Sequence, residues 1–308
     1  MDKIFKEEYN LQQIMQMYWL RPEVITWTSM ASFLIGKELK NENNIVELGI
    51  GNGYFTFISL GGRFKFPYDW YYNVDLKESS GDIYNTFYEH NNIESFIEHK
   101  PKTRINLAID HKESLLLQAS HLGFIDKTIL ADGNKPFDLP KNTEVFYSNI
   151  LYWLKDPFEI IKRIDMSLDK VKLVLVFPNN RYKLNTQSHQ LKNNLQILLN
   201  SGRETNMLWT MDLEEFEKNL SKYTSFKIKK SQTYVSELNS SFYDVGLKPL
   251  SKPLIKMVNK LSLEDRNEVK EEWIKTLEPY LTELLLEEIN NGPVNGGFNF
   301  VVLEKNNA

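Results

Sequence analysis

The sequence contains no cysteine and only five histidines, and these absences exclude several kinds of chemistry. Without cysteine, the chain forms no disulfide, no thiolate metal site and no cysteine nucleophile. The histidines show no spacing of the H-E-x-x-H type, so no metal site is predicted. Nothing in this composition indicates an oxidising compartment, and we expect a cytoplasmic protein.

Long apolar runs and an excess of positive charge are also missing. The 37 basic and 41 acidic residues give a net charge of −4, which provides no positive field for nucleic acid. No segment is apolar for long enough to span a bilayer, and the N-terminus mixes charged with apolar residues, unlike a signal peptide. We therefore expect neither a nucleic-acid partner nor a membrane span.

The hydrophobic content of 42% suffices for a large core, and apolar segments alternate in type along the chain. Strands are predicted at 44–51, 104–110, 126–132, 143–151 and 171–178, and helices at 54–60, 112–123 and 157–168. This alternation is typical of βαβ units with parallel strands. Two later segments, 225–238 and 296–305, have the alternating pattern of a half-exposed antiparallel pair. The fold class is therefore α/β, a Rossmann-like doubly wound seven-stranded sheet, mainly parallel, with an antiparallel last strand.

Three segments lie outside this alternation, within what we predict to be a single domain of residues 1–308. Residues 1–40 are predicted to form an N-terminal helical cap, 61–104 an aromatic-rich insertion, and 239–291 a helical insertion before the last strand. The last segment carries an apolar stripe at helical spacing: Trp273, Leu277, Leu281, Leu284 and Leu285. We expect this stripe to pack onto the domain or onto a partner subunit, which would give a homodimer.

The glycine-rich stretch "ELGIGNG" follows the first predicted strand. Gly49, Gly51 and Gly53 allow backbone angles closed to other residues and let a ligand approach the chain. At the carboxyl end of a strand, such a loop marks a small-molecule crevice. A dinucleotide fingerprint would place its last glycine one residue later, at Tyr54. Glu47 would repel a pyrophosphate but attract a ligand with ammonium and sulfonium charges.

The pattern E-x-G-x-G-x-G after an apolar strand resembles motif I of class I S-adenosylmethionine-dependent methyltransferases. Segments between 104 and 178 are similar to the later motifs of this family, in the same order. The resemblance implies the cofactor S-adenosylmethionine, with Asp110 holding its ribose hydroxyls and His111 next to it. A rival assignment puts the ribose acid at Asp75, but only Asp110 is followed by a helix and a third strand.

The resemblance also implies positions for the two ends of the cofactor. Asp132 and Gly133 match the turn beside the adenine, and Ser148 and Asn149 match the segment along the methionine end. The stretch "YWLRPEVITW" is similar to the N-terminal cap of bacterial members that modify small molecules or sugars. Its Arg21 could pair with the carboxylate of the methionine end, or it could be a surface arginine.

The catalytic residue is less clear than the cofactor residues. Relatives commonly carry Glu-His after the fourth strand, where this chain has Tyr-Trp, so no base can be carried over. Candidates are Asp69 and His189, while His90 and His99 could also reach an acceptor and His121 is expected to be structural. The aromatic residues of the insertion either line an acceptor pocket or form its own core: Phe64, Phe66, Tyr68, Trp70, Tyr71 and Tyr72.

These features predict methyl transfer from S-adenosylmethionine to an oxygen or nitrogen of a small-molecule acceptor, such as a carbohydrate or a secondary metabolite. Methyl transfer depends chiefly on orientation and needs a base only where the acceptor must lose a proton. The alternatives are an NAD(P)-dependent oxidoreductase and a non-catalytic methyltransferase-like binding module. Fold alone does not separate them.

Overall fold

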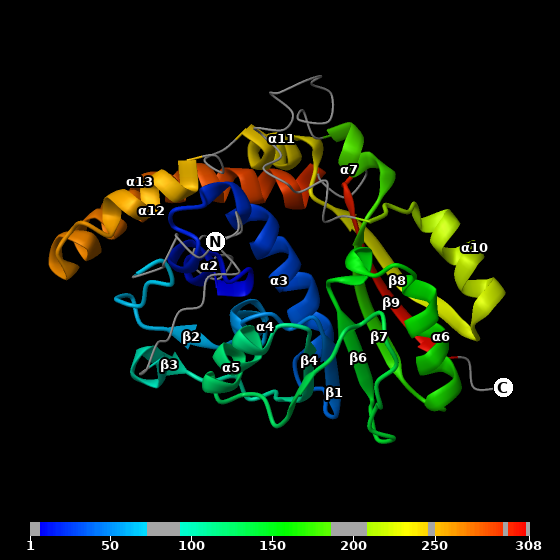
Figure 1. The fold of residues 1–308 in the computed structure, drawn as a ribbon. Coiled ribbons are helices and arrows are strands. Elements are labelled where there is room, and N and C mark those ends of the chain that lie inside the picture. Colours follow the sequence, from blue (N-terminus) through cyan, green and yellow to red (C-terminus); the bar gives the residue numbers. More distant parts are fainter. Residues whose placement is uncertain (1–6, 73–92, 186–207, 246–249, 292–294, 306–308) are drawn as a thin grey trace.

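A seven-stranded sheet forms the centre of the computed structural model, which describes residues 7–72, 93–185, 208–245, 250–291 and 295–305 (Figure 1). The strand order is β5-β4-β1-β6-β7-β9-β8. The strands are β1 (Ile45–Leu48), β4 (Ile105–Asp110), β5 (Thr128–Leu130), β6 (Val145–Ser148), β7 (Lys172–Pro178), β8 (Phe226–Tyr234) and β9 (Phe298–Lys305). The first five strands in this order pair in parallel, and β9 is antiparallel to both neighbours. This topology confirms the predicted fold class.

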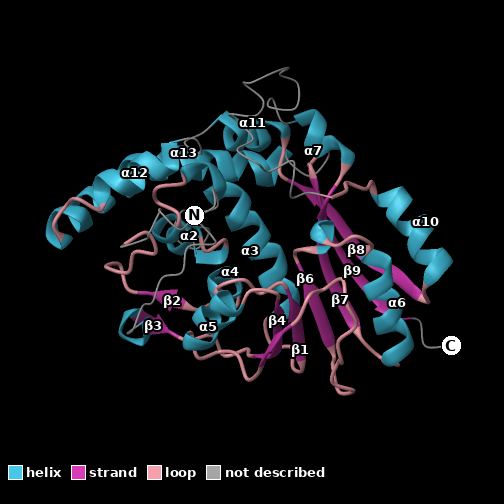
Figure 2. Cartoon of the chain, in the orientation of Figure 1, coloured by secondary structure: helices cyan, strands magenta, loops and turns pink. Residues whose placement is uncertain are grey.

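Helices cover both faces of the sheet, as Figure 2 shows. One apolar cluster packs α2, α3, α4, α5 and α13 against one face, and a second packs α6 and α10 against the other. The helices of the described segments are α2 (Leu11–Met17), α3 (Ile25–Leu39), α4 (Tyr54–Ser59), α5 (Glu113–His121), α6 (Pro157–Ser167), α7 (Asn180–Asn185), α10 (Leu213–Tyr223), α11 (Glu237–Val245), α12 (Ser251–Val258) and α13 (Leu263–Asn291). Short 3-10 turns occur at η1 (Pro22–Val24), η3 (Ile93–Phe96) and η4 (Leu151–Trp153).

Local sequence explains where several of these elements begin and end. The Asp156 side chain accepts a hydrogen bond from the Phe158 amide, and Pro157 occupies the first turn of α6. At its C-terminal end, the helix α5 stops before Gly123, which has a φ of 71°. The predicted strand over 44–51 ends early, at Leu48, because Gly49 takes a φ of 84°.

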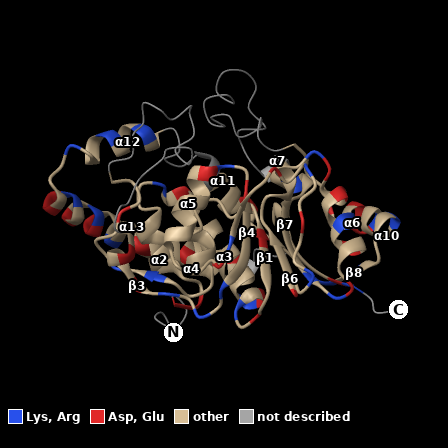
Figure 3. Cartoon of the chain, turned by 60° about the horizontal axis from the view of Figure 1, so that its bottom comes forward, with Lys and Arg blue, Asp and Glu red and all other residues tan. Residues whose placement is uncertain are grey.

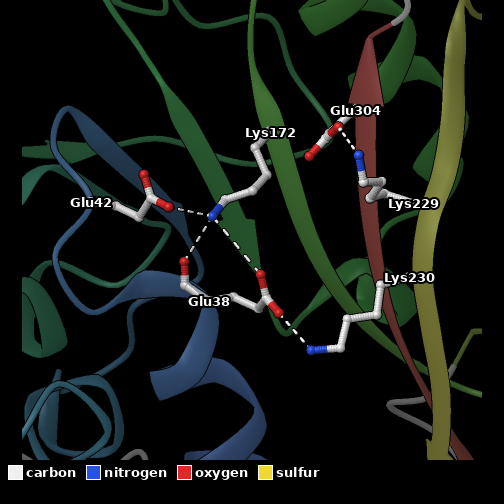
Figure 4. Close-up of polar contacts among 6 residues, drawn as sticks. All are labelled: Glu38, Glu42, Lys172, Lys229, Lys230 and Glu304. Atoms are coloured by element: carbon white, nitrogen blue, oxygen red, sulfur yellow. Dashed lines mark hydrogen bonds and ion pairs between the residues drawn. The ribbon is translucent and has the colours of Figure 1, made fainter.

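The C-terminal end of α3 is attached to the sheet by charged side chains (Figure 4). Lys172, the first residue of β7, lies 2.6 Å from Glu42 and 3.9 Å from Glu38. Lys230 of β8 reaches the other oxygen of Glu38 at 2.7 Å. Acidic and basic residues are interspersed along α10 and α13, as the colouring of Figure 3 shows.

The aromatic insertion forms a small layer beside the glycine loop. Its strands β2 (Arg63–Phe64) and β3 (Ile97–His99) pair antiparallel. Phe64 and Tyr68 stack with ring centroids 4.6 Å apart, and Tyr54 of α4 meets both rings and Trp70 edge-on. These rings are buried and belong to the same apolar cluster as α2, α3 and α4, so the aromatic cluster is part of the domain's core.

The long helix α13 lies across the N-terminal helices, at the top of Figure 1. Leu281 and Leu285 are buried, and the rest of the predicted apolar stripe packs against the same core. The stripe is therefore used within the chain, which removes the reason for expecting a homodimer. Two buried cations in the first half of α13 contact the insertion. Arg266 pairs with Asp69 at 2.8 Å, and Lys270 donates to the backbone carbonyl of Tyr68 at 2.6 Å.

We predict that this buried ion pair is needed for stability. Asp69→Ala leaves Arg266 buried without its counter-ion, so the free energy of unfolding should fall by about 3–5 kcal/mol in urea titrations. The matched control is Asp126→Ala, which removes an ion pair with Arg104 whose side chains are 41% and 48% exposed. That control should cost less than about 1 kcal/mol. Equal losses in the two variants would contradict the prediction.

Candidate functional site

The predicted site residues follow four neighbouring strands, β5, β4, β1 and β6, at the carboxyl edge of the sheet. The strand order reverses between β1 and β6, and in open α/β sheets ligands bind at such a switch point. The topology therefore brings together side chains from 47 to 149 in the sequence.

The three glycines of the loop have different tasks. All have positive φ, at 84°, 57° and 77° for Gly49, Gly51 and Gly53. A Cβ on Gly49 would lie 2.2 Å from the Ile150 side chain, and one on Gly53 would lie 3.0 Å from Ala119. A Cβ on Gly51 would meet no described atom within 4 Å. Packing thus explains the first and third glycines, whereas Gly51 is where a ligand can approach the backbone.

Asp110 ties the glycine loop to the end of β4. Its buried carboxylate accepts hydrogen bonds from the Gly51 amide at 2.9 Å and the Lys112 amide at 3.0 Å. The exposed ring of His111 lies 3.3 Å from the same carboxylate. Because each carboxylate oxygen accepts about two hydrogen bonds, Oδ2 can still accept from a ligand hydroxyl.

Glu47 is buried at the end of β1 without a charged partner among the described residues. The Thr56 hydroxyl donates to its Oε1 at 2.8 Å, and no described group bonds its Oε2. The pKa of Glu47 is raised to about 8, chiefly by burial, while the Thr56 hydrogen bond lowers it and the charge of Asp110 raises it. A positive ligand charge nearby would favour the ionised form.

Tyr147 lies beside Glu47 on the neighbouring strand, and it is not among the site residues predicted from the sequence. The two residues are paired in register between β1 and β6. The Tyr147 hydroxyl is fully buried and bonds no described residue. Burial is the main cause that raises the pKa of this phenol, and the charge of Glu47 also raises it. A polar hydroxyl inside the apolar run "VFYS" was the available signal, since a buried tyrosine usually finds a partner.

The adenine-side candidates differ in their surroundings. Asp132 is partly exposed, and its carboxylate accepts from the backbone and side chain of Asn134. The backbone hydrogen bond, followed by the side-chain one, lowers the pKa of Asp132. Gly133 is buried, and a Cβ there would lie 2.8 Å from Leu154, so packing accounts for that glycine.

The methionine-side candidates also separate. Ser148 is fully buried and donates to the backbone carbonyl of Leu48 at 3.1 Å, which joins β6 to β1. Its hydroxyl is therefore engaged within the sheet. Asn149, one residue further, is partly exposed at the strand end, where its amide can face a ligand.

Arg21 and Asp69 are both buried. Arg21 donates from Nε to Glu23, so it is not a surface arginine. Asp69 accepts from Trp19 and from the Tyr71 amide and pairs with Arg266. These contacts engage both oxygens of the Asp69 carboxylate in the interior and account for this residue structurally.

The histidines of the described segments lie at the surface. His99 is exposed on β3, and His121 is exposed at the end of α5. His189 and His90, as well as the rival ribose acid Asp75, lie outside the described residues. Across the described segments, no three His, Asp or Glu side chains are grouped so that they could hold a metal ion. No helix in these segments is long and apolar enough to cross a membrane.

No protein-family profile and no curated protein matches the chain. Its fold is similar to that of solved S-adenosylmethionine-dependent methyltransferases. One is the plantazolicin methyltransferase BpumL in complex with SAH, with 14% identity and a TM-score of 0.44 over 99% of this chain and 91% of that one. Another is a methyltransferase from Mesorhizobium loti, with 12% identity and a TM-score of 0.45 over 89% of this chain and 97% of that one.

We predict that Glu47 makes stability depend on pH. Its folded pKa of about 8 lies above its ordinary value of 4.5. Between these values the folded chain holds a proton that the unfolded chain releases, so stability falls as pH rises, by up to about 1.4 kcal/mol per pH unit. Glu47→Gln should flatten this fall in urea titrations from about pH 5 to about pH 8. The exposed control Glu271→Gln should not change the slope. Parallel curves for Glu47→Gln and the native chain would show that Glu47 is ionised when folded.

Proposed function

We propose that the chain is an S-adenosylmethionine-dependent methyltransferase acting on a small-molecule acceptor. The observation that carries this proposal is Glu47, a buried carboxyl with an unpartnered oxygen beside a glycine loop that is open at Gly51. A buried acceptor without a donor is costly, and a ligand that supplies positive charge offsets the cost.

The residues around the loop fit the parts of this cofactor. Asp110 accepts the ribose hydroxyls, and the Gly51 backbone allows the close approach that a side chain would block. Glu47 favours the ammonium and sulfonium end, with Asn149 beside it and Asp132 toward the adenine. The Asp110 carboxylate at the loop opposes a pyrophosphate, and the third glycine comes one residue early for a dinucleotide fingerprint, which disfavours the NAD(P)-dependent alternative. The helix after the loop, α4, has only six residues.

The cofactor supplies an activated methyl group on sulfur, and the chain's own contribution is placement. Glu47 and Asp110 orient the ligand from two neighbouring strands. No described carboxylate or histidine at the loop is placed as an obvious base. This fits an acceptor whose oxygen or nitrogen attacks once it is held in line.

The direct test is a thermal-shift comparison of S-adenosylmethionine, S-adenosylhomocysteine (SAH) and NAD. A ligand that binds only the folded state stabilises it by about 2.7 kcal/mol at a hundredfold excess over its Kd. We expect both sulfur ligands to raise Tm and NAD to leave it unchanged. A shift with NAD alone, or with none of the three, would rule the proposal out. Methyl uptake from labelled cofactor into fractionated metabolite pools then separates an enzyme from a binding module.

Gly51 gives a matched pair of variants for the same site. Gly51→Ala places a methyl group where the ligand approaches, so SAH affinity should fall by about tenfold or more. Gly61→Ala is the control, because Gly61 also has positive φ, at 98°, with only a Lys40 carbon at 4.0 Å from its Cβ position. Both variants place an alanine at positive φ, and Gly61→Ala is the more strained because 98° lies outside the left-handed region, so a larger loss of SAH affinity in Gly51→Ala reports ligand contact and not strain. Equal SAH affinity in the two variants would place the ligand elsewhere.

A further inference from the structure

A second buried carboxyl without a charged partner lies near the far end of α13. Glu288 is 1% exposed. Its Oε2 accepts from the Ser236 amide at 2.8 Å and from the Asn239 side chain at 2.6 Å. Its Oε1 bonds no described group, and no lysine or arginine of the described segments pairs with it. A buried carboxylate left without a cation is unfavourable.

Asn239 adds a second unsatisfied acceptor at the same place. Its side-chain nitrogen is committed to Glu288, which fixes its Oδ1 as the remaining acceptor. This Oδ1 is buried and bonds no described group. The two free acceptors call for a ligand with several donors and a positive charge. An ammonium group has three N–H donors and one positive charge, so it satisfies both.

The backbone beside this pair is held in a strained conformation. Val235 has a φ of 65°, a region that β-branched residues rarely adopt. Its carbonyl accepts from the Gly297 amide at 2.9 Å, and the next amide, Ser236, is directed at Glu288. The surrounding structure therefore maintains an unfavourable geometry where the carboxyl is bound.

Glu288 lies on the same side of the sheet as the candidate cofactor loop. Tyr234 ends β8 opposite Phe298 of β9, and both belong to the cluster that includes Tyr147. Burial is the main cause of the raised pKa of Tyr147, and Glu47 and Tyr234 add to it. Burial likewise raises the pKa of Tyr234, with Glu288 among the further causes. Tyr147 and Tyr234 thus belong to the apolar cluster on the side of the sheet that α13 covers.

We propose that Glu288 and Asn239 bind an ammonium group on the methyl acceptor as a recognition contact, which makes the acceptor a small molecule that carries a primary amine. The methylated atom is a different one, because an ammonium nitrogen has no lone pair with which to form the new bond. The statement that this ligand is the methyl acceptor rests on the proposed methyltransferase function. The subsite itself rests only on Glu288 and Asn239. Tyr234 and Phe298 pair where β8 ends, two residues before Ser236, and their ring centroids are 5.9 Å apart.

The test uses the full chain, with and without SAH, in calorimetric titrations with 2-phenylethylamine and n-butylamine. Their neutral counterparts are 2-phenylethanol and n-butanol. We expect the amines to bind about tenfold or more tightly than the alcohols, because only the amines supply charge to Glu288. Equal binding of amine and alcohol, or no binding of either amine, overturns the proposal. This comparison needs no variant.

Glu288→Gln should weaken amine binding by about tenfold or more while SAH affinity stays within about twofold. The matched control is Glu283→Gln, an exposed glutamate on the same helix, which should change neither affinity. Unchanged amine binding in Glu288→Gln overturns the subsite. SAH binding without amine binding rejects the subsite alone, and amine binding without SAH binding rejects the methyltransferase function alone.

Discussion

The buried contact between Asp69 and Arg266 joins three parts of the chain that the sequence separates. Trp19 of the N-terminal segment donates to Asp69, the aromatic insertion contributes Asp69 itself, and α13 contributes Arg266. Removing two charges from water is expensive, so the pair stabilises little by itself. Its effect is to define one arrangement of these parts, because any other placement leaves a buried charge unpaired. The position of α13, and with it Glu288, depends on this contact.

The sheet could be predicted from the sequence because its information is local. Alternating apolar strands and amphipathic helices determine a parallel α/β sheet, and "GGFNFVVLEK" correctly became its antiparallel strand. The arrangement of the cap and the two insertions could not be predicted in the same way. Arg266 and Asp69 are 197 residues apart, and nothing in either local pattern indicates the other. The ion pair of Asp69 could not be predicted for this reason, since its partner lies on a helix whose sequence pattern showed only an apolar stripe.

The residues of the candidate site also differ in whether the local sequence predicts them. Glu47, Gly51 and Asp110 follow strands directly, so the topology places them together once the strands are known. Tyr147 was missed because its importance comes from register with Glu47, which only pairing between strands reveals. Gly133 and Ser148 match a family pattern, yet their contacts with Leu154 and Leu48 also account for them. A motif position therefore reports packing and ligand contact together, and only the structure separates the two.

The buried carboxyl groups show how the chain distinguishes structural from ligand-binding acids. Asp69 receives an arginine, an indole and an amide, so its charge is neutralised within the fold. Glu47 and Glu288 receive hydrogen bonds on one oxygen only, and no cation of the described segments reaches either. Since the fold supplies a cation to the buried carboxylate of Asp69, it is equally able to supply cations to Glu47 and Glu288. That the two unpaired acids lie on the loop-facing side of the sheet is explained if their cations come from ligands, a sulfonium cofactor at one and an amine at the other.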